Sequence, residues 1–162
     1  MHGISFLVGL VATGRLHSIG PGASIEEVDQ AVKADFIEVE DVEYGTLRRD
    51  YGFVELYFSG GTGEWVMTSG MIELHRLAAD DEGMAAEWHR DMGVEFPEYC
   101  SWSELREELS QTPDAPTFEL RYQGGYLEYR APETNVSVMV VGDQMDRDDC
   151  PGRGDIFSVS FG

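Results

Sequence analysis

Apolar residues recur at helical spacing near the start of the chain, and they would share one wide face of a helix: Ile4, Phe6, Leu7, Leu10, Val11 and Leu16. The uninterrupted stretch Ile4–Ala12 is shorter than the roughly 20 apolar residues that span a bilayer. It also lacks the basic leader of a secretory signal. We therefore predict a packed N-terminal helix and a cytoplasmic protein.

Two further helices are indicated by a serine followed three residues later by a glutamate. The pairs are Ser24 with Glu27 and Ser101 with Glu104, and each precedes a short amphipathic run. In such a capping box the serine hydroxyl accepts from the amide of the third helical residue, and the glutamate reaches back to the cap amide. Pro113 is expected to stop the second of these helices.

Period-2 alternation predicts antiparallel strands. In the segment Gly52–Phe58, Phe53, Glu55 and Tyr57 would point to one face, and the residues between them to the other. Asp50 fits a turn that leads into this segment. The other predicted strands are Glu64–Thr68, Gly70–His75, Gly125–Tyr129, Val136–Val141 and Gly154–Ser160, with a glycine-rich turn over residues 59–63.

The helices and strands recur in a similar order in the two halves of the chain. Gly52–Phe58 matches Gly125–Tyr129, and Gly70–His75 matches the last strand. A fixed order of elements that occurs twice is typical of an internal repeat. The prediction is an α+β fold of two diverged helix–antiparallel-meander repeats, residues 1–77 and 99–162, packed into one compact unit. Residues 78–98 would form an acidic linker with a helix over Glu82–Met92.

The charge balance narrows the class of partner. The chain has 31 acidic and 11 basic residues in 162, a formal net charge of −20, with 42% hydrophobic residues that suffice for a core. A strongly anionic surface repels nucleic acid and anionic lipid headgroups. We therefore expect neither nucleic acid nor membrane as a partner, and the charge favours a basic protein.

Candidate chemistry is sparse. The four histidines and the two cysteines lack metal-ligand spacing, and Cys100 and Cys150 are expected to be reduced. The acidic run Asp143–Asp149 lacks the central glycine and terminal glutamate of a calcium loop. The glycine-rich segments Gly60–Gly63 and Gly152–Gly154 lack phosphate-binding signatures. The sequence therefore predicts no catalytic residue, metal or cofactor.

Aromatic side chains beside acids are the remaining candidates, because partner-binding surfaces are enriched in tyrosine and tryptophan anchors. The alternative is that these aromatic residues complete the core. The predicted partner-binding residues are Glu38, Glu40, Asp41, Glu43, Tyr44, Trp65, Tyr99, Trp102, Asp143 and Asp146.

Three segments carry a resemblance to a known group of proteins: Phe6–Arg15, Leu47–Gly52 together with Glu55, and His75–Leu77. In these segments the chain resembles small actinobacterial immunity proteins of polymorphic toxin systems. The tandem helix–sheet arrangement is similar to the architecture of β-lactamase inhibitor protein. The resemblance implies a non-enzymatic inhibitor that binds a cognate toxin.

The leading hypothesis is therefore an immunity protein that blocks a basic toxin, for example a nuclease, through an acidic and aromatic-rich surface. The alternative is a small enzyme or ligand-binding domain with a cleft between the two repeats. The polar side chains that bind or react in that cleft would then be those of Asp50, Glu55, His75 or Glu128.

Overall fold

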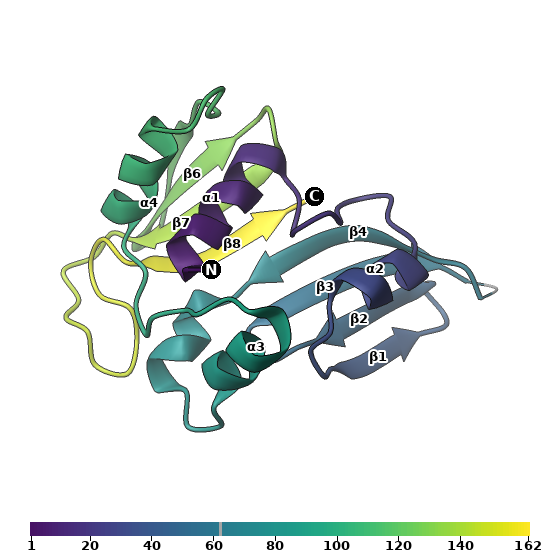
Figure 1. Ribbon diagram of the computed structural model, residues 1–162. Helices are drawn as coiled ribbons and strands as arrows, with labels where there is room; N and C mark the ends of the chain where they lie inside the picture. The colour runs from purple at the N-terminus through teal and green to yellow at the C-terminus, as the bar shows by residue number, and fades with distance from the viewer. Residues whose placement is uncertain (62) are drawn as a thin grey trace.

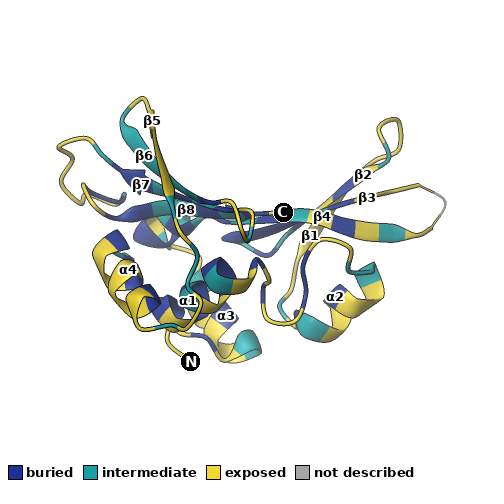
Figure 2. Ribbon diagram, turned by 90° about the horizontal axis from the view of Figure 1, so that it is seen from above, coloured by how far each residue is buried: buried dark blue, intermediate teal, exposed yellow. Residues whose placement is uncertain are grey.

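The chain folds into an eight-stranded antiparallel sheet with its helices packed on one face (Figure 1, Figure 2). The computed structural model describes residues 1–61 and 63–162. Thr62, in the predicted turn over residues 59–63, lies outside the described residues. The strand order is β1-β2-β3-β4-β8-β7-β6-β5. The α+β class is confirmed.

The first half of the sheet follows two helices, α1 (Gly3–Thr13) and α2 (Ile25–Ala31). Its four strands pair in chain order and are β1 (Ile37–Asp41), β2 (Thr46–Asp50), β3 (Val54–Gly60) and β4 (Trp65–Ile72). A short 3₁₀ helix, η1 (Leu74–Ala79), and α3 (Met84–Met92) then lead towards the second half.

The second half begins with α4 (Trp102–Ser110), which packs beside α1. Its strands are β5 (Glu119–Gln123), β6 (Tyr126–Ala131), β7 (Val136–Val141) and β8 (Ile156–Phe161). No helix in the described part of the chain is long and apolar enough to cross a membrane.

The two halves of the sheet meet where β4 pairs with β8. Gly70 lies opposite Phe161, and Ile72 lies opposite Val159. One cluster of buried apolar side chains extends under both halves, from Leu56 in β3 to Val138 in β7. The helices therefore cover a continuous core.

The helix ends follow the predicted chemistry. At α2 both hydrogen bonds of the capping box form, since Glu27 N donates to Ser24 Oγ and Ser24 N donates to Glu27 Oε2. At α4 the hydroxyl of Ser101 accepts from the Glu104 amide at 3.1 Å. A side chain outside the sequence prediction caps α3, because the carboxylate of Asp80 accepts from the first two helical amides. Local sequence thus sets where these helices begin.

Some strand predictions were wrong. The predicted strands Glu64–Thr68 and Gly70–His75 are replaced by one strand, β4, which ends at Ile72, and His75 lies in η1. Strands β1, β2 and β5 lie outside every predicted strand. The predicted correspondence of Gly52–Phe58 with Gly125–Tyr129 is also shifted by one strand. The central pair of the sheet is β4 and β8, and β3 is directly next to this pair, whereas β6 is one strand further out on the other side.

The two faces of the sheet differ as the alternation predicted. Leu56 and Phe58 are buried under the helices, whereas Glu55 and Tyr57 lie on the face without helices. Both ends of the sheet bend away from the helices, so the helix-free face is concave (Figure 2). Small side chains line its centre, namely Ser69, Ser137, Ser158 and Ser160.

Two glycine substitutions are expected to have opposite effects on stability. A Cβ at Gly70 would lie 2.4 Å from Phe161 Cζ and 2.9 Å from Leu56 Cδ2, so Gly70→Ala should lower the free energy of unfolding by about 1–3 kcal/mol. Gly9 is an exposed residue of α1, and a Cβ added there would meet open space. Gly9→Ala should therefore raise the free energy of unfolding by about 0.5–1 kcal/mol. Urea unfolding measures both changes. Equal effects would contradict the tight packing at the β4–β8 junction.

Candidate functional site

Exposed apolar side chains and carboxylates are concentrated at the β1 edge, which we define as residues 36–44. Five large apolar side chains in this segment are between 42% and 81% exposed: Phe36, Ile37, Val39, Val42 and Tyr44. Four carboxylates alternate with them, and no basic residue occurs between Lys33 and Arg48. Among the described strands β1 pairs only with β2, so its outer side is unpaired. A patch of this composition is typical of a partner-binding surface.

The carboxylates of the β1 edge have different roles. Glu38 accepts from Nε of Arg49 at 2.9 Å, and Arg49 also donates to Asp29 of α2 at 2.6 Å. Asp41 Oδ1 accepts from the amide of Tyr44 in the turn between β1 and β2. Glu40 and Glu43 make no side-chain hydrogen bond or ion pair with any described residue. Glu38 thus stabilises the fold, and Glu40 and Glu43 can meet a partner without loss of internal contacts.

The other predicted partner-binding residues lie apart from the β1 edge. Trp65 is half-buried at the start of β4, and Asp143 and Asp146 are exposed in the loop between β7 and β8. Tyr99 packs under the guanidinium of Arg147 at 4.6 Å. Trp102 is buried and stacks on Tyr129 with ring centroids 4.2 Å apart, so its side chain belongs to the core. We therefore leave Trp102 out of the proposed surface.

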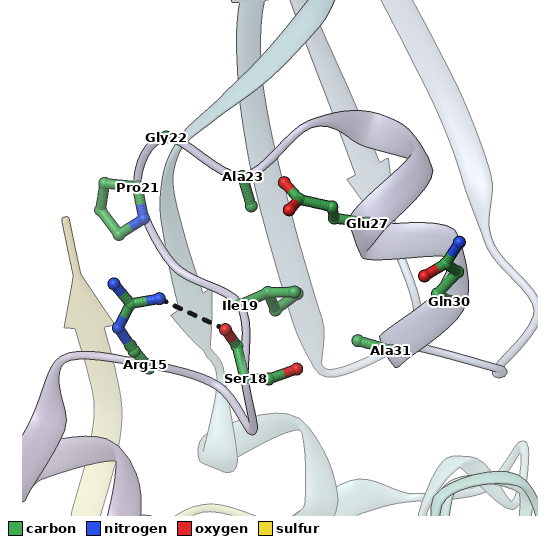
Figure 3. A pocket seen from close by; sticks show the side chains of 9 residues that line it. All are labelled: Arg15, Ser18, Ile19, Pro21, Gly22, Ala23, Glu27, Gln30 and Ala31. Atoms are coloured by element: carbon green, nitrogen blue, oxygen red, sulfur yellow. Dashed lines mark hydrogen bonds between the residues drawn. The ribbon is translucent and has the colours of Figure 1, made fainter.

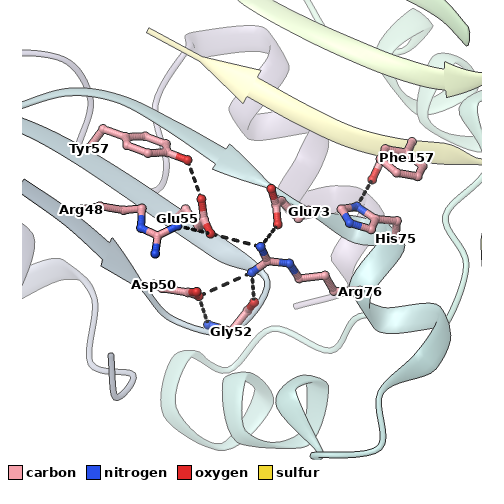
Figure 4. A network of polar contacts seen from close by, with 9 residues as sticks. All are labelled: Arg48, Asp50, Gly52, Glu55, Tyr57, Glu73, His75, Arg76 and Phe157. Atoms are coloured by element: carbon pink, nitrogen blue, oxygen red, sulfur yellow. Dashed lines mark hydrogen bonds and ion pairs between the residues drawn. The ribbon is translucent and has the colours of Figure 1, made fainter. Parts of the chain in front are cut away.

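A network of charged side chains lies on the helix-free face, where β2 and β3 meet η1 (Figure 4). Glu55 is at its centre, with a side chain only 4% exposed. Its carboxylate accepts from the hydroxyl of Tyr57 at 2.5 Å and from Nη2 of Arg76 at 3.1 Å, and it pairs with Arg48 at 3.5 Å. Burial of a carboxylate is tolerated when it is paired in this way.

Arg76 joins the network to the end of the sheet. Its Nη1 donates to the carbonyl of Gly52 at 2.7 Å and lies 3.6 Å from Asp50, and its Nη2 pairs with Glu55 and Glu73 (Figure 4). Asp50 in turn accepts from the amide of Gly52 at 2.8 Å, which confirms the predicted turn. The arginine is therefore surrounded by acceptors of the fold itself.

The network also changes the chemistry of Tyr57. Burial, followed by the hydrogen bond to Glu55 and the negative charge of that carboxylate, raises the pKa of Tyr57 well above the usual value for a tyrosine. The phenol therefore stays protonated and holds Glu55 in place. Glu55 and Tyr57 are thus hydrogen-bonded to each other within the fold.

A hollow of about 650 Å³ opens next to the network, and we call it the sheet-end hollow. Its lining residues come from the start of β1, the end of β2, the stretch from η1 to the start of α3, and β8 with the loop before it. Apolar contacts are offered by Ile37, Met84 and Phe157. The charged side chains that line it are Asp50, Arg76, Asp81, Glu82 and Asp149, with the imidazole of His75 beside them.

A second hollow, of about 500 Å³, lies between the loop after α1 and helix α2 (Figure 3). Its two charged side chains, Arg15 and Glu27, make hydrogen bonds within the fold. Arg15 donates to the carbonyl of Ser18 at 3.3 Å, and Glu27 is engaged in the α2 capping box. The sheet-end hollow is the better candidate site because more of its carboxylates lack internal partners.

The cysteines and histidines are dispersed. Cys100 and Cys150 are both free thiols, and burial raises the pKa of Cys100 to about 12, so this thiol is a poor nucleophile. His75 stacks on Phe157 with ring centroids 4.1 Å apart and an interplanar angle of 2°. Within residues 1–61 and 63–162, no three histidine, cysteine or acidic side chains are placed to share a metal ion.

The acidic excess is not centred on the concave face. Arg48, Arg121 and Arg130 lie there together with Glu55 and Glu128. The face therefore mixes both signs, whereas the β1 edge carries carboxylates without any basic residue. This contrast distinguishes the edge from the rest of the sheet.

Several residues of the hollow were not among the predicted site residues. Asp50 and His75 are predicted site residues only under the alternative function, and the sequence predicts no site role for Arg76, Met84 or Phe157. The alternation of Ile37 and Val39 with Glu38 and Glu40 is a period-2 signal for a strand, which the density of acids concealed. Contacts between η1 and β8 have no such local signal, since they join residues about 80 positions apart.

Comparison with known proteins finds no match for this chain among family models, curated proteins or solved structures.

Proposed function

We propose that this protein is a non-enzymatic inhibitor of the immunity type, which binds a basic toxin domain through its β1 edge. The observation that carries this proposal is the combination of five exposed apolar side chains and four carboxylates on the unpaired strand β1 and in the residues directly before and after it. Apolar anchors supply affinity at an interface, and complementary charge speeds association and selects the partner. A toxin that acts on a polyanion, such as a nuclease, presents the basic cleft that this edge complements.

The state of the potentially reactive groups supports a binding role. Glu55 is engaged by Tyr57 and two arginines, and the pKa of Cys100 is raised. These groups are held by the fold, whereas Glu40 and Glu43 face solvent. The two free thiols fit the reducing cytoplasm, where a toxin made in the same cell would have to be neutralised.

The proposal includes the diverged repeat. Each half of the sheet consists of four consecutive strands that follow a short helix, α2 or α4, and each of these helices starts at a serine cap. The halves meet through β4 and β8, the last strand of each. A duplication of one helix–meander unit accounts for this arrangement, with β1 and β5 left as the two outer edges.

A ligand-binding domain is the second candidate, and the sheet-end hollow is the observation that favours it. Its volume of about 650 Å³ is within the range of small-molecule sites. Five charged side chains line this hollow beside its apolar surface, however. The mixture suits a side chain of a protein partner better than a free apolar ligand.

The test is co-expression with the product of the neighbouring gene, followed by binding measurements at about 50 mM and 500 mM salt. We expect a complex whose affinity falls at least tenfold at the higher salt, because the attraction is between charges. Glu40→Lys with Glu43→Lys should weaken binding by about 10- to 100-fold. The matched control is Glu95→Lys with Glu107→Lys, which changes the net charge equally at exposed sites away from the edge.

Three results would contradict the proposal. Tight binding that is indifferent to salt excludes recognition by charge. Equal losses in the edge variant and its control exclude the β1 edge as the interface. The absence of any complex with the neighbouring product argues against an immunity protein. Thermal unfolding of each variant establishes that its fold is intact.

A further inference from the structure

The sheet-end hollow adjoins the β1 edge, because Ile37 belongs to both. A partner that covers the edge would therefore also lie over the mouth of the hollow. The hollow has a volume of about 650 Å³, and its lining combines apolar side chains with carboxylates. The chemical class of that side chain follows from how the walls and charges are arranged.

Two stacked rings, those of His75 and Phe157, are among the side chains that line the hollow. His75 and Phe157 stack in parallel, and the imidazole Nδ1 of His75 lies 3.4 Å from the carbonyl of Phe157. Figure 4 shows this ring pair next to Arg76 and Glu73. Met84 and Ile37 supply aliphatic surface. Walls of this kind suit a long methylene stem that ends in a planar cationic group.

The charges of the hollow favour a cation. Asp81, Glu82 and Asp149 line it and make no side-chain hydrogen bond or ion pair with any described residue. The single arginine of the lining is Arg76, and both of its Nη atoms are engaged by acceptors of the fold: Asp50, Glu55, Glu73 and the Gly52 carbonyl. An incoming positive group would thus find carboxylates without partners.

We infer that the sheet-end hollow binds one arginine side chain of the basic partner, an inference that rests on the proposed function. A guanidinium is planar, so it can stack on the His75–Phe157 pair and donate to two carboxylates at once. An ammonium is a compact, strongly hydrated charge and gains less from a flat wall. A metal ion does not fit, because the described carboxylates are not placed to share one.

The experiment uses small probes and no partner protein. N-acetyl-Gly-Arg-Gly-amide is titrated into the full chain at about 150 mM salt, and NMR follows the Met84 methyl group and the rings of His75 and Phe157. The same peptide with citrulline keeps the shape of the side chain and removes its charge, and a lysine peptide keeps the charge and removes the plane. We expect saturable shifts of these three residues, with binding at least tenfold weaker for citrulline and severalfold weaker for lysine.

Two triple variants separate a built site from general attraction. Asp81→Asn, Glu82→Gln and Asp149→Asn together should weaken binding of the arginine peptide at least fivefold. Glu26→Gln, Glu95→Gln and Glu107→Gln remove the same number of charges elsewhere and should leave binding unchanged. All six residues lie outside helix caps and ion pairs of the described chain, and the amide spectrum establishes that both variants are folded.

Each other outcome overturns the inference. Equal binding of the citrulline peptide means that charge is not recognised, and equal binding of the lysine peptide means that the guanidinium is not. Equal losses in both triple variants, or shifts away from the hollow, mean general attraction to an acidic protein. If the toxin forms a complex but the peptide does not bind, the inference about the hollow is wrong and the proposed function stands. If the peptide binds but no complex with the toxin forms, the proposed function is wrong.

Discussion

Replacing Trp88 with alanine is expected to lower the free energy of unfolding by about 3–5 kcal/mol. Trp88 is 1% exposed and is the only residue of α3 that is fully buried. Its ring packs edge-on against Phe53 of the core, with centroids 5.4 Å apart, and contacts Tyr51 at 6.4 Å. The alanine variant would leave a cavity at the point where α3 is attached to the sheet, and a cavity adds to the lost transfer energy.

The matched control for this prediction is Trp88→Phe. The indole Nε1 is buried and has no hydrogen-bond partner among the described residues, so phenylalanine removes a polar group that makes no bond. We expect that variant to lose less than about 1.5 kcal/mol. Urea unfolding measures both values, and hydrogen exchange shows whether the amides of α3 open first. Similar losses for the two variants would contradict the view that ring volume at this site holds α3.

The parts of the fold that sequence predicts well are those with a local cause. The spacing of Leu7, Leu10 and Val11 indicated α1, and Ser24 with Glu27 marked the start of α2. Strand β7 has the predicted bounds, Val136–Val141, because it lies in the centre of one half and its valines alternate towards the core. In each case the residues that set the structure are within a few positions of one another.

The missed strands have a different origin. All five residues of β1 are exposed, and so are all five of β5, so the apolar residues that alternate in each segment are not buried in the core. These segments are strands because β2 and β6 offer them a hydrogen-bonding edge. Such pairing depends on how the whole sheet is assembled, and a local pattern does not contain it.

The candidate site shows the same division. The acidic run from Glu38 to Glu43 was conspicuous in the sequence, but its position on an unpaired edge follows only from the strand order. Each of the three tryptophans, Trp65, Trp88 and Trp102, has a glutamate within two positions in the sequence, so composition does not distinguish them. The structure separates them, since Trp88 and Trp102 are buried and Trp65 is half-buried. Burial of a large side chain is a tertiary property, so an aromatic residue beside an acid is a weak predictor of an interface.

The β1 edge and the polar network are linked through β2. Strand β1 is held by its pairing with β2 and by Arg49, which joins Glu38 to Asp29 of α2. The neighbouring residues Arg48 and Asp50 of β2 reach the network around Glu55 on the opposite face. A change in the network can therefore disturb the edge and the hollow together, which makes Glu55 the most informative position on the helix-free face.

Glu55→Leu is expected to lower the free energy of unfolding by about 2–4 kcal/mol. The variant removes the acceptor of the Tyr57 hydroxyl and the carboxylate that Arg48 and Arg76 share. The loss stays below that of a fully buried pair, since both arginines are partly exposed and can turn to water. Glu128→Leu is the matched control. Glu128 is a half-buried glutamate of β6 on the same face of the sheet, and its carboxylate accepts from the exposed Gln123. This variant should lower the free energy of unfolding by less than about 1 kcal/mol.

Glu55→Gln tests the same network through the ionisation of Tyr57. The raised pKa of Tyr57 means that its protonated form stabilises the folded state below pH values of about 10, where a tyrosine of the unfolded chain ionises, and that this contribution is lost as the pH rises further. Glutamine removes the negative charge beside the phenol, so the pKa of Tyr57 should fall towards the usual value. Ring-carbon NMR of tyrosine between about pH 9 and 12 follows this titration. An unchanged pKa would mean that burial alone protects the phenol and that Glu55 is not its partner in solution.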